Sequence, residues 1–348
     1  MNAEKVAGFK ERMLAYWTRE ETDRALISVM SQTPYKTPYA GHQYYNAEGS
    51  HQKMLAEIEH TRYFGEAMAA FLPYFGTAGI AEYAGCSANY TDRTVWFEPF
   101  LEEPDAAQIE YRHPEIFQKQ LDTVHRLCEL AGEDYFVGVS DNCSIMDALV
   151  GIRGGEELLI DMLTDPEFVT EAVERLLPIY KETQEALFKA VEKNNHGCIH
   201  SWMHLWAPRR MAQLQCDMSV MISKEHFDRF VMPELEETTA FLDYSIYHLD
   251  GQEQIRHLDS LLSLKHLNAI QWQPVAGQPR VSDFIPYLEQ IQKAGKGLML
   301  RVQPDEIPKL LDNLSCRGLL LKVEQKLPSA EEAQEIVRYV ESHSVDRG

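Results

Sequence analysis

Short apolar or β-branched runs alternate with longer amphipathic stretches along most of the chain. Apolar runs of this length are typical of buried strands, whereas the longer stretches place apolar residues at helical spacing. The runs that predict strands are ALISVM (25–30), YFVGVS (135–140), GCIHSW (197–202), SIYHL (245–249), AIQW (269–272), GLMLR (297–301) and GLLLKV (318–323). A further strand is expected in the glycine-rich segment between residues 70 and 85.

This alternation predicts parallel strands joined by helical crossovers, and about eight such units predict a closed (β/α)8 (TIM) barrel, an α/β fold. The alternative is a doubly wound open sheet, but no glycine fingerprint follows the first strand. The charged N-terminal segment has a helical pattern and predicts a helical extension before the barrel. Because no repeat, low-complexity tract or linker interrupts the chain, residues 1–348 are predicted to form a single domain.

Three helix starts can be located from capping residues. Asp165 followed by Pro166 predicts an N-cap and a first-turn proline where a long helical stretch restarts. Ser282 is expected to cap another helix, and Ser329 with Glu332 has the spacing of a capping box.

Composition limits the class of protein and of partner. Of 348 residues, 45% are hydrophobic and 25% are charged, as in an ordinary globular protein. A formal charge of −21 disfavours nucleic acid or an anionic membrane as a partner, and no apolar run approaches the ~20 residues of a membrane helix. The cysteines lack a CxxC pair, which predicts reduced thiols and a cytoplasmic protein; they are Cys86, Cys128, Cys143, Cys198, Cys216 and Cys316.

The segment YHLDGQEQIRHLD contains two His-x-Asp pairs with different expected roles. In a parallel barrel the active site lies at the C-terminal ends of the strands. His248 and Asp250 end a predicted strand and, being two residues apart, should point to the same face. Asp259 and His257 follow a turn and are expected to play a structural part at the start of the next helix.

Polar and aromatic residues end several other predicted strands, which predicts a pocket for a polar or aromatic small molecule. The residues predicted to bind the substrate are Asn142, Trp202, Trp206, Tyr247, Gln271, Gln273 and Arg301. Further candidates at strand ends are Asp141, His200, His204, Trp272, Gln303, Lys322 and Glu324. For any one of them, ordinary packing in the core is the competing interpretation.

Two chemistries remain open for His248 and Asp250. With Glu324 as a third ligand they could hold zinc or another divalent metal, whereas Cys316 precedes its strand and should lie at the opposite end. Without a metal, His248 and Asp250 would share general acid/base work. No G-x-S-x-G elbow supports a serine nucleophile.

Several segments together resemble the uroporphyrinogen decarboxylase superfamily, which includes corrinoid-dependent methyltransferases. They are ERMLAYWTREETDRALISV, VGIRGGEELLIDMLTDPEFV, MISKEHFDRFVMPEL, AIQWQPVAGQP and IQKAGKGLML, and the resemblance spans roughly residues 10 to 342. It implies a (β/α)8 barrel with its pocket at the C-terminal rim. The chain differs from both main branches. The segment SQTPYKTPYAGHQYYN lacks the arginines of true decarboxylases. His248-x-Asp250 stands at the position that resembles the His-x-Cys pattern of the zinc methyltransferases.

The resemblance implies a methyltransferase that moves a methyl group between a small molecule and a corrinoid carried by a partner protein. Two alternatives stay open. One is a metal-free lyase that decarboxylates a small acid, with Asp250 or His248 as proton donor and Arg301 or Arg153 binding the carboxylate. The other is a barrel that binds a small molecule without catalysis. A homodimer is also expected from the resemblance.

Overall fold

A seven-stranded sheet forms the centre of the protein, whose computed structural model describes residues 3–140, 142 and 144–347. Its strands, in spatial order, are β2 (Thr61–Gly65), β1 (Leu26–Gln32), β13 (Leu319–Val323), β12 (Gly297–Val302), β11 (Ala269–Gln273), β10 (Tyr244–Asp250) and β9 (Met211–Leu214). All neighbours from β9 to β1 are parallel, and β2 alone pairs antiparallel. The carboxyl ends of six strands therefore lie along one edge.

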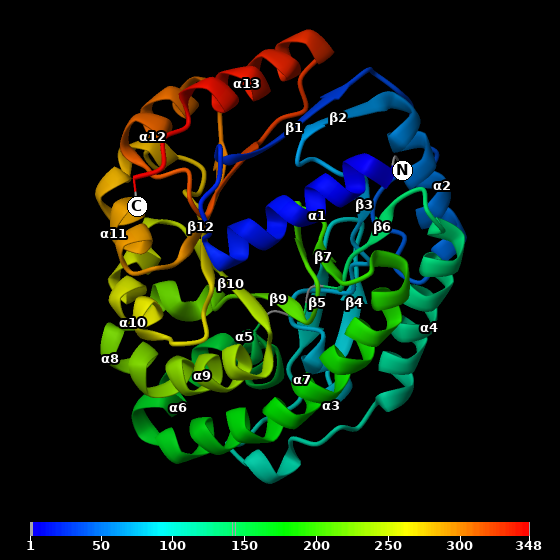
Figure 1. The fold of residues 1–348 in the computed structure, drawn as a ribbon. Helices are drawn as coiled ribbons and strands as arrows, with labels where there is room; N and C mark the ends of the chain where they lie inside the picture. Colours follow the sequence, from blue (N-terminus) through cyan, green and yellow to red (C-terminus); the bar gives the residue numbers. More distant parts are fainter. Residues whose placement is uncertain (1–2, 141, 143, 348) are drawn as a thin grey trace.

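Helices surround this sheet in a ring (Figure 1). They are α1 (Ala3–Thr18), α2 (Ala47–His60), α3 (Ile80–Ala84), α4 (Pro114–Ala131), α5 (Ile145–Arg153), α6 (Gly155–Thr164), α7 (Pro166–Asn195), α8 (Lys224–His226), α9 (Met232–Phe241), α10 (Leu258–Ser263), α11 (Ile285–Lys293), α12 (Ile307–Asn313) and α13 (Ala330–His343). Within the described ranges, none of these helices is both long and apolar enough to cross a membrane.

The remaining strands form three small sheets. The pairs are β3 (Ala70–Phe71) parallel with β6 (Phe136–Val137), β4 (Ser87–Tyr90) antiparallel with β5 (Val95–Glu98), and β7 (Cys198–His200) antiparallel with β8 (Leu205–Ala207). The fold is therefore α/β and barrel-like. Hydrogen bonds among the described residues do not join the predicted strands into one closed sheet, so the closed barrel remains a prediction.

Each predicted run contains a strand, but the sequence missed β2, β4, β5, β8 and β9. After β7 the chain turns back through His204, which has a left-handed φ of 56°. The chain then runs antiparallel through β8, so Trp206 lies opposite Ile199 instead of beyond the C-terminal end of β7. β9 completes the parallel ladder beside β10.

Two of the three predicted helix caps are confirmed. The Asp165 side chain accepts the Phe168 N–H at 3.3 Å, and the Ser329 hydroxyl accepts the N–H groups of Glu331 and Glu332. The Glu332 side chain makes no return bond to the Ser329 N–H among the described residues, so the N-cap is present without the full capping box. The Ser282 cap was wrong, because that residue lies within a short 3-10 turn that precedes α11.

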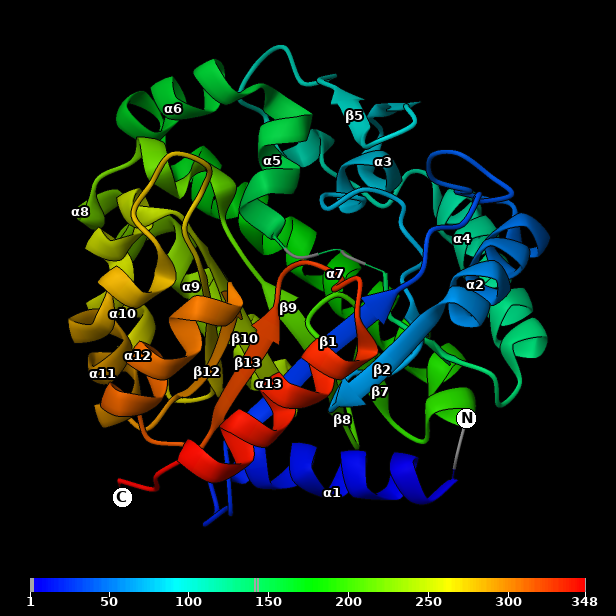
Figure 2. The same ribbon diagram turned by 90° about the horizontal axis from the view of Figure 1, so that it is seen from above.

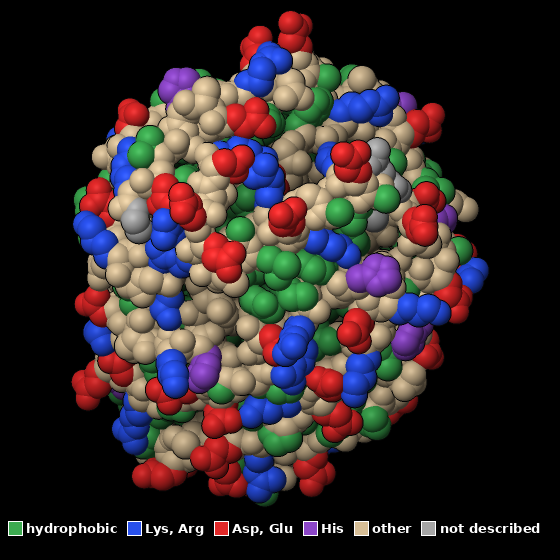
Figure 3. All heavy atoms as spheres, in the orientation of Figure 1, with side chains coloured by type: hydrophobic (Ala, Val, Ile, Leu, Met, Phe, Trp, Pro, Cys, Tyr) green, Lys and Arg blue, Asp and Glu red, His purple; other side chains and the backbone are tan. Residues whose placement is uncertain are grey.

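Helix α1 covers the N-terminal end of the strands, as the predicted helical extension. Figure 2 shows it at the opposite end of the molecule from α3, α5 and β5. The Trp17 indole N–H donates to the Trp206 carbonyl at 2.8 Å, and Arg19 donates to the carbonyls of Gln292 and Lys296 at 3.0 and 3.1 Å. The face seen in Figure 3 mixes acidic and basic side chains around a hydrophobic patch. Since α1 occupies this end, the other end is free for a site.

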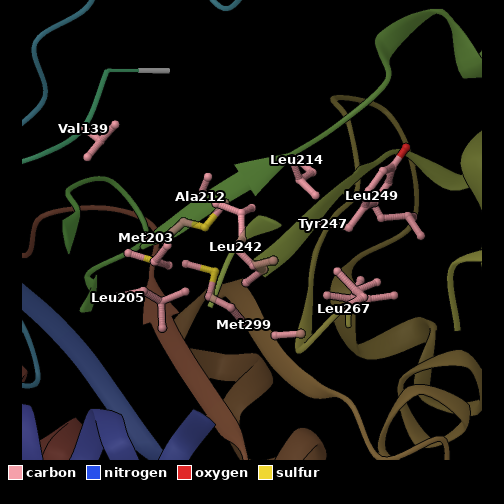
Figure 4. Close-up of a cluster of buried hydrophobic side chains, with 14 of the residues drawn as sticks. Val139, Met203, Leu205, Ala212, Leu214, Leu242, Tyr247, Leu249, Leu267 and Met299 are labelled. Atoms are coloured by element: carbon pink, nitrogen blue, oxygen red, sulfur yellow. The ribbon is translucent and has the colours of Figure 1, made fainter. Parts of the chain in front are cut away.

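The apolar core continues across both faces of the sheet. Figure 4 shows Met203, Leu205 and Met299 on one side of a buried cluster and Tyr247 and Leu249 on the other. All five are at most 1% exposed. Alternate residues of β10 therefore face opposite layers, with His248 on the opposite face from its neighbours.

Gly65, at the end of β2, lies against the backbone of β1. Its φ is +58°, and a Cβ there would lie 2.0 Å from the Ile27 carbonyl oxygen. The next residue, Glu66, accepts the Ile27 N–H at 2.7 Å and forms a buried ion pair with Arg24 at 2.6 Å. The close approach positions this buried carboxylate.

We expect Gly65→Ala to destabilise the protein strongly, and Gly132→Ala is its matched control. Gly132 also has a left-handed φ, +48°, but nothing lies within 4 Å of its Cβ position. The control should cost only the strain of its positive-φ backbone (φ +48°, ψ −119°), about 1–3 kcal/mol. Gly65→Ala should cost roughly 2 kcal/mol more, because a Cβ must also displace backbone. Urea denaturation of both variants checks this, and equal losses would contradict the collision.

Candidate functional site

Strand pairing places five polar residues in one row across five strands. The register pairs Asp250 with Gln273, Arg301 with Lys322, and Lys322 with Ser28. An Arg301 Nη1 to Gln273 Oε1 hydrogen bond of 2.7 Å joins the two halves of the row. In parallel strands, paired residues point to the same face, so these side chains share the interior of the ladder. The row lies near the carboxyl ends, at the opposite end from α1.

His248 lies one layer below this row, with a defined ring orientation. Its Nδ1 hydrogen-bonds the Gln271 Oε1 on the paired residue of β11. Its Nε2 lies 3.9 Å from Asp250 Oδ2, and the Trp202 ring packs edge-on at 5.7 Å between centroids. Because the amide oxygen of Gln271 accepts from Nδ1–H, Nε2 is the ring nitrogen directed to the site.

One carboxylate oxygen of Asp250, Oδ1, is buried and accepts no hydrogen bond from the described residues. Burial raises the pKa of the nearby Asp217, and the negative charge of Asp250 raises it further. A buried acceptor without a donor is costly, so Asp250 is suited to receive an N–H or O–H from a bound molecule.

A buried carboxyl cluster lies behind Asp250, on the side of the helices. Asp147 accepts the N–H groups of Asp217 and Met218 at 2.9 and 3.2 Å. Burial, followed by the charge of Asp217, raises the pKa of Asp147 to about 6. Glu234 accepts the first N–H groups of α5, from Ile145 and Met146, at 2.7 and 3.0 Å.

Sequence reasoning missed this cluster. Ser144 and Asp147 have the S-x-x-D spacing that precedes an apolar run, and Ser144 does accept the Asp147 N–H at 3.0 Å, so that signal was available. Nothing local singles out Glu234, which meets Ile145 from 89 positions away.

The other end of the row carries positive charge. Arg301 Nη2 pairs with Glu324 Oε1 at 2.9 Å, and Gln303 donates to the other Glu324 oxygen at 2.9 Å. Hydrogen bonds from Nη1 to Gln273 and from Nη2 to Glu324 thus fix the guanidinium, while its buried Nε–H has no acceptor among the described residues.

Lys322 is a buried lysine beside Arg301. Its Nζ donates to the Trp202 carbonyl, and burial, aided by the charge of Arg301, lowers its pKa to about 7. His204, which hydrogen-bonds Ser28, has its pKa lowered well below the usual value by burial and then by Lys322. Lys322, His204 and Ser28 therefore form a buried polar group beside Arg301. The sequence predicted Lys322 and His204 as strand-end residues but did not predict Ser28.

The structure brings most of the predicted site residues together. His248, Asp250, Trp202, Gln271, Gln273 and Arg301 all belong to the two layers just described. Asn142 lines a small cavity with His200 and Gln213, and its Oδ1 accepts the Ile80 N–H at 3.3 Å. The predicted residue Asp141 lies outside the described residues.

Two predicted binding residues lie elsewhere. Trp206 is 4% exposed at the end covered by α1, where its indole donates to the Asn195 carbonyl at 3.2 Å. Tyr247 faces the helices rather than the interior, because it alternates with His248. Burial raises its pKa, with the charges of Cys216 and Asp147 next in effect.

Arg153 and the second His-x-Asp pair have structural contacts. Arg153 pairs with Asp161 at 2.7 Å. His257 bonds the Ser219 carbonyl at 3.0 Å and stacks on a phenylalanine ring, and Asp259 accepts from a glutamine side chain at 2.7 Å. These contacts agree with the structural part expected for His257 and Asp259.

The described residues do not fit the predicted metal site. Glu324 is held by Arg301 and Gln303, and only His248 and Asp250 lie together. Among the residues described, no group of three His, Cys, Asp or Glu side chains could hold a metal ion. A catalytic zinc needs three protein ligands, so the described trio of His248, Asp250 and Glu324 does not supply them.

No model of a known protein family matches this sequence, and no curated protein is detectably similar to it. Among solved structures, a methyltransferase from Methanosarcina mazei has a similar fold, with a TM-score of 0.64. The match covers 96% of this chain and 98% of that chain at 13% sequence identity. At this identity the similarity establishes a shared fold over nearly the whole length, and the superfamily remains a prediction.

We expect Glu234→Gln to flatten the pH dependence of stability. Burial raises the pKa of Glu234 to about 8 in the folded protein, above its unfolded value near 4.5. The stability contributed by its neutral form is complete below that unfolded value and is lost as the pH rises through about 8. Wild type should therefore lose free energy of unfolding between pH 5 and 8.

The variant should cost about 1–2 kcal/mol at pH 5, since one backbone N–H loses its acceptor, and this deficit should shrink toward pH 8. Urea denaturation across this range measures both slopes. Glu237→Gln is the control, because Glu237 lies exposed on the same helix and pairs with Lys181 at 2.7 Å. If the free energy of unfolding of wild type and of Glu234→Gln changed with pH by the same slope, the raised pKa of Glu234 would be contradicted.

Proposed function

We propose that this protein is a methyltransferase that acts on a small molecule held around His248. The observation that carries the proposal is the fold shared with a protein named as a methyltransferase, which covers 96% of this chain. The two polar layers at the carboxyl ends of the strands support it, because sites of parallel α/β barrels lie at that end. The described geometry favours acid/base chemistry by side chains.

His248 is suited to carry the proton that methyl transfer requires. When a neutral methylated sulfur, oxygen or nitrogen loses its methyl group, the bonding electron pair stays on the heteroatom, which then takes up a proton. His248 Nε2 can donate this proton, and Asp250, 3.9 Å away, stabilises the protonated ring beforehand. In the reverse direction the same nitrogen accepts the proton.

Gln271 positions His248 for this step. Its Oε1 accepts from Nδ1, which leaves Nε2 directed to the site, and the Trp202 ring packs against the imidazole. Gln271 is fully buried, so water does not compete for the hydrogen bond that orients the His248 ring. We further propose that the methyl acceptor is a corrinoid on a partner protein, which would supply a strong nucleophile for the methyl carbon.

We expect His248→Gln to lower kcat/KM for methyl transfer by about 10²- to 10⁴-fold, the usual share of a general acid. Small methylated thiols, ethers and amines serve as donors and reduced cobalamin as acceptor, with transfer followed by cobalamin absorbance. His257→Gln is the matched control from the same segment. It should keep the activity per folded molecule and lower stability by about 0.5–1.5 kcal/mol, because an amide cannot replace the stacking of His257 on the Phe227 ring.

Unchanged transfer in the His248 variant would contradict its assigned part. Release of carbon dioxide from a small acid, without methyl transfer to cobalamin, would contradict the methyltransferase itself and favour a carboxy-lyase.

A further inference from the structure

Lys322 is a buried lysine, 9% exposed, that forms no ion pair with a carboxylate among the described residues. Its cationic neighbours do have partners, since Arg301 pairs with Glu324 at 2.9 Å and Lys326 pairs with Glu57 at 2.7 Å. Buried charges in proteins are normally paired, so an unpaired lysine in the interior of a candidate site points to an anion supplied from outside.

A second donor faces the same place. Lys322 and Arg301 are direct partners in the register of β13 and β12, so their side chains leave the sheet on one face. Arg301 Nε is buried and has no hydrogen-bond partner among the described residues. Lys322 Nζ donates to the Trp202 carbonyl and has further hydrogens to give.

We propose that Lys322 and Arg301 form a subsite for the carboxylate of a small substrate whose methylated end reaches His248. This inference rests on the proposed function, and it names the class of substrate as a methylated small carboxylic acid. Glu324 already pairs with Arg301, so Lys322 supplies at most one further positive charge, which matches a monoanionic carboxylate better than a dianionic phosphate.

The distance between the two ends fits a small molecule. β13, which carries Lys322, is three positions from β10, which carries His248 and Asp250. At ~4.8 Å per strand the two ends lie roughly 14 Å apart along the sheet, and less across its curved interior. Trp202 touches both ends, because its carbonyl accepts from Lys322 and its ring contacts His248.

The test compares 6-(methylthio)hexanoate, which is long enough to reach both ends, with its uncharged amide, 6-(methylthio)hexanamide, by isothermal titration calorimetry on the full chain. Wild type should bind the carboxylate about tenfold to a hundredfold more tightly, as expected for a charge-assisted contact. Lys322→Met should lose this preference, whereas Lys322→Arg, which keeps a cation, should retain part of it.

Lys296→Met is the matched control. Lys296 is also buried, at 8% exposed, but it donates to the carbonyls of Leu264 and Leu267 at the opposite end of the strands. This variant should keep the full preference for the carboxylate. Circular dichroism and thermal unfolding establish that each variant is folded before titration.

Equal affinity of wild type for carboxylate and amide, including failure to bind either at millimolar concentration, would overturn the proposal. A preference that persists in folded Lys322→Met would overturn it too, and so would tighter binding of inorganic phosphate than of the carboxylate. Binding is measured without turnover, so the two hypotheses fail separately. Carboxylate binding without methyl transfer would refute only the proposed function, and methyl transfer that is indifferent to Lys322 would refute only the subsite.

Discussion

The in-register parallel ladder from β9 to β1 is the constraint on which the site depends. Hydrogen bonds between neighbouring strands align Asp250 with Gln273 and Arg301 with Lys322, although these residues are far apart in sequence. A shift of one residue in any of these strands would turn its polar side chain into the helix layer. The arrangement of polar side chains at this end of the molecule is therefore specified by backbone pairing, and α1 closes the other end.

The ladder also separates charge of opposite sign within the interior. At β10 the carboxylates of Asp250 and Asp217 lie close enough that one raises the pKa of the other. Three strands away, Lys322 lies beside Arg301, whose charge lowers the pKa of Lys322. Placing like charges together in a low-dielectric site costs free energy. A ligand that brings a hydrogen-bond donor to Asp250 and an anionic group to Lys322 would offset this cost. This argues for a binding site rather than for packing alone.

The sequence predicted the strands well because buried parallel strands are continuous apolar runs. It also located His248 and Asp250, since a period of two puts them on one face. The same period should have excluded Tyr247 from the predicted binding residues, because it lies next to His248 and must point to the opposite face of the strand. β9 was missed because MAQL has an inward-facing polar Gln213, and Trp206 was misplaced because no local pattern revealed the reversal at His204. Glu234 reaches the site only through tertiary packing.

Asp250 stands where the resemblance would expect a cysteine, and its surroundings give that difference a physical meaning. A thiolate is a soft metal ligand and a nucleophile, whereas a carboxylate is a weak nucleophile that, beside an imidazole, can stabilise the protonated ring. Gln271 hydrogen-bonds Nδ1 of that ring, and Asp250 lies near Nε2. The two side chains therefore contact the His248 imidazole at opposite nitrogens. A carboxylate at this end also repels the acid group of a substrate. In the proposed complex this directs the anionic end toward Lys322 and leaves the methylated end beside His248.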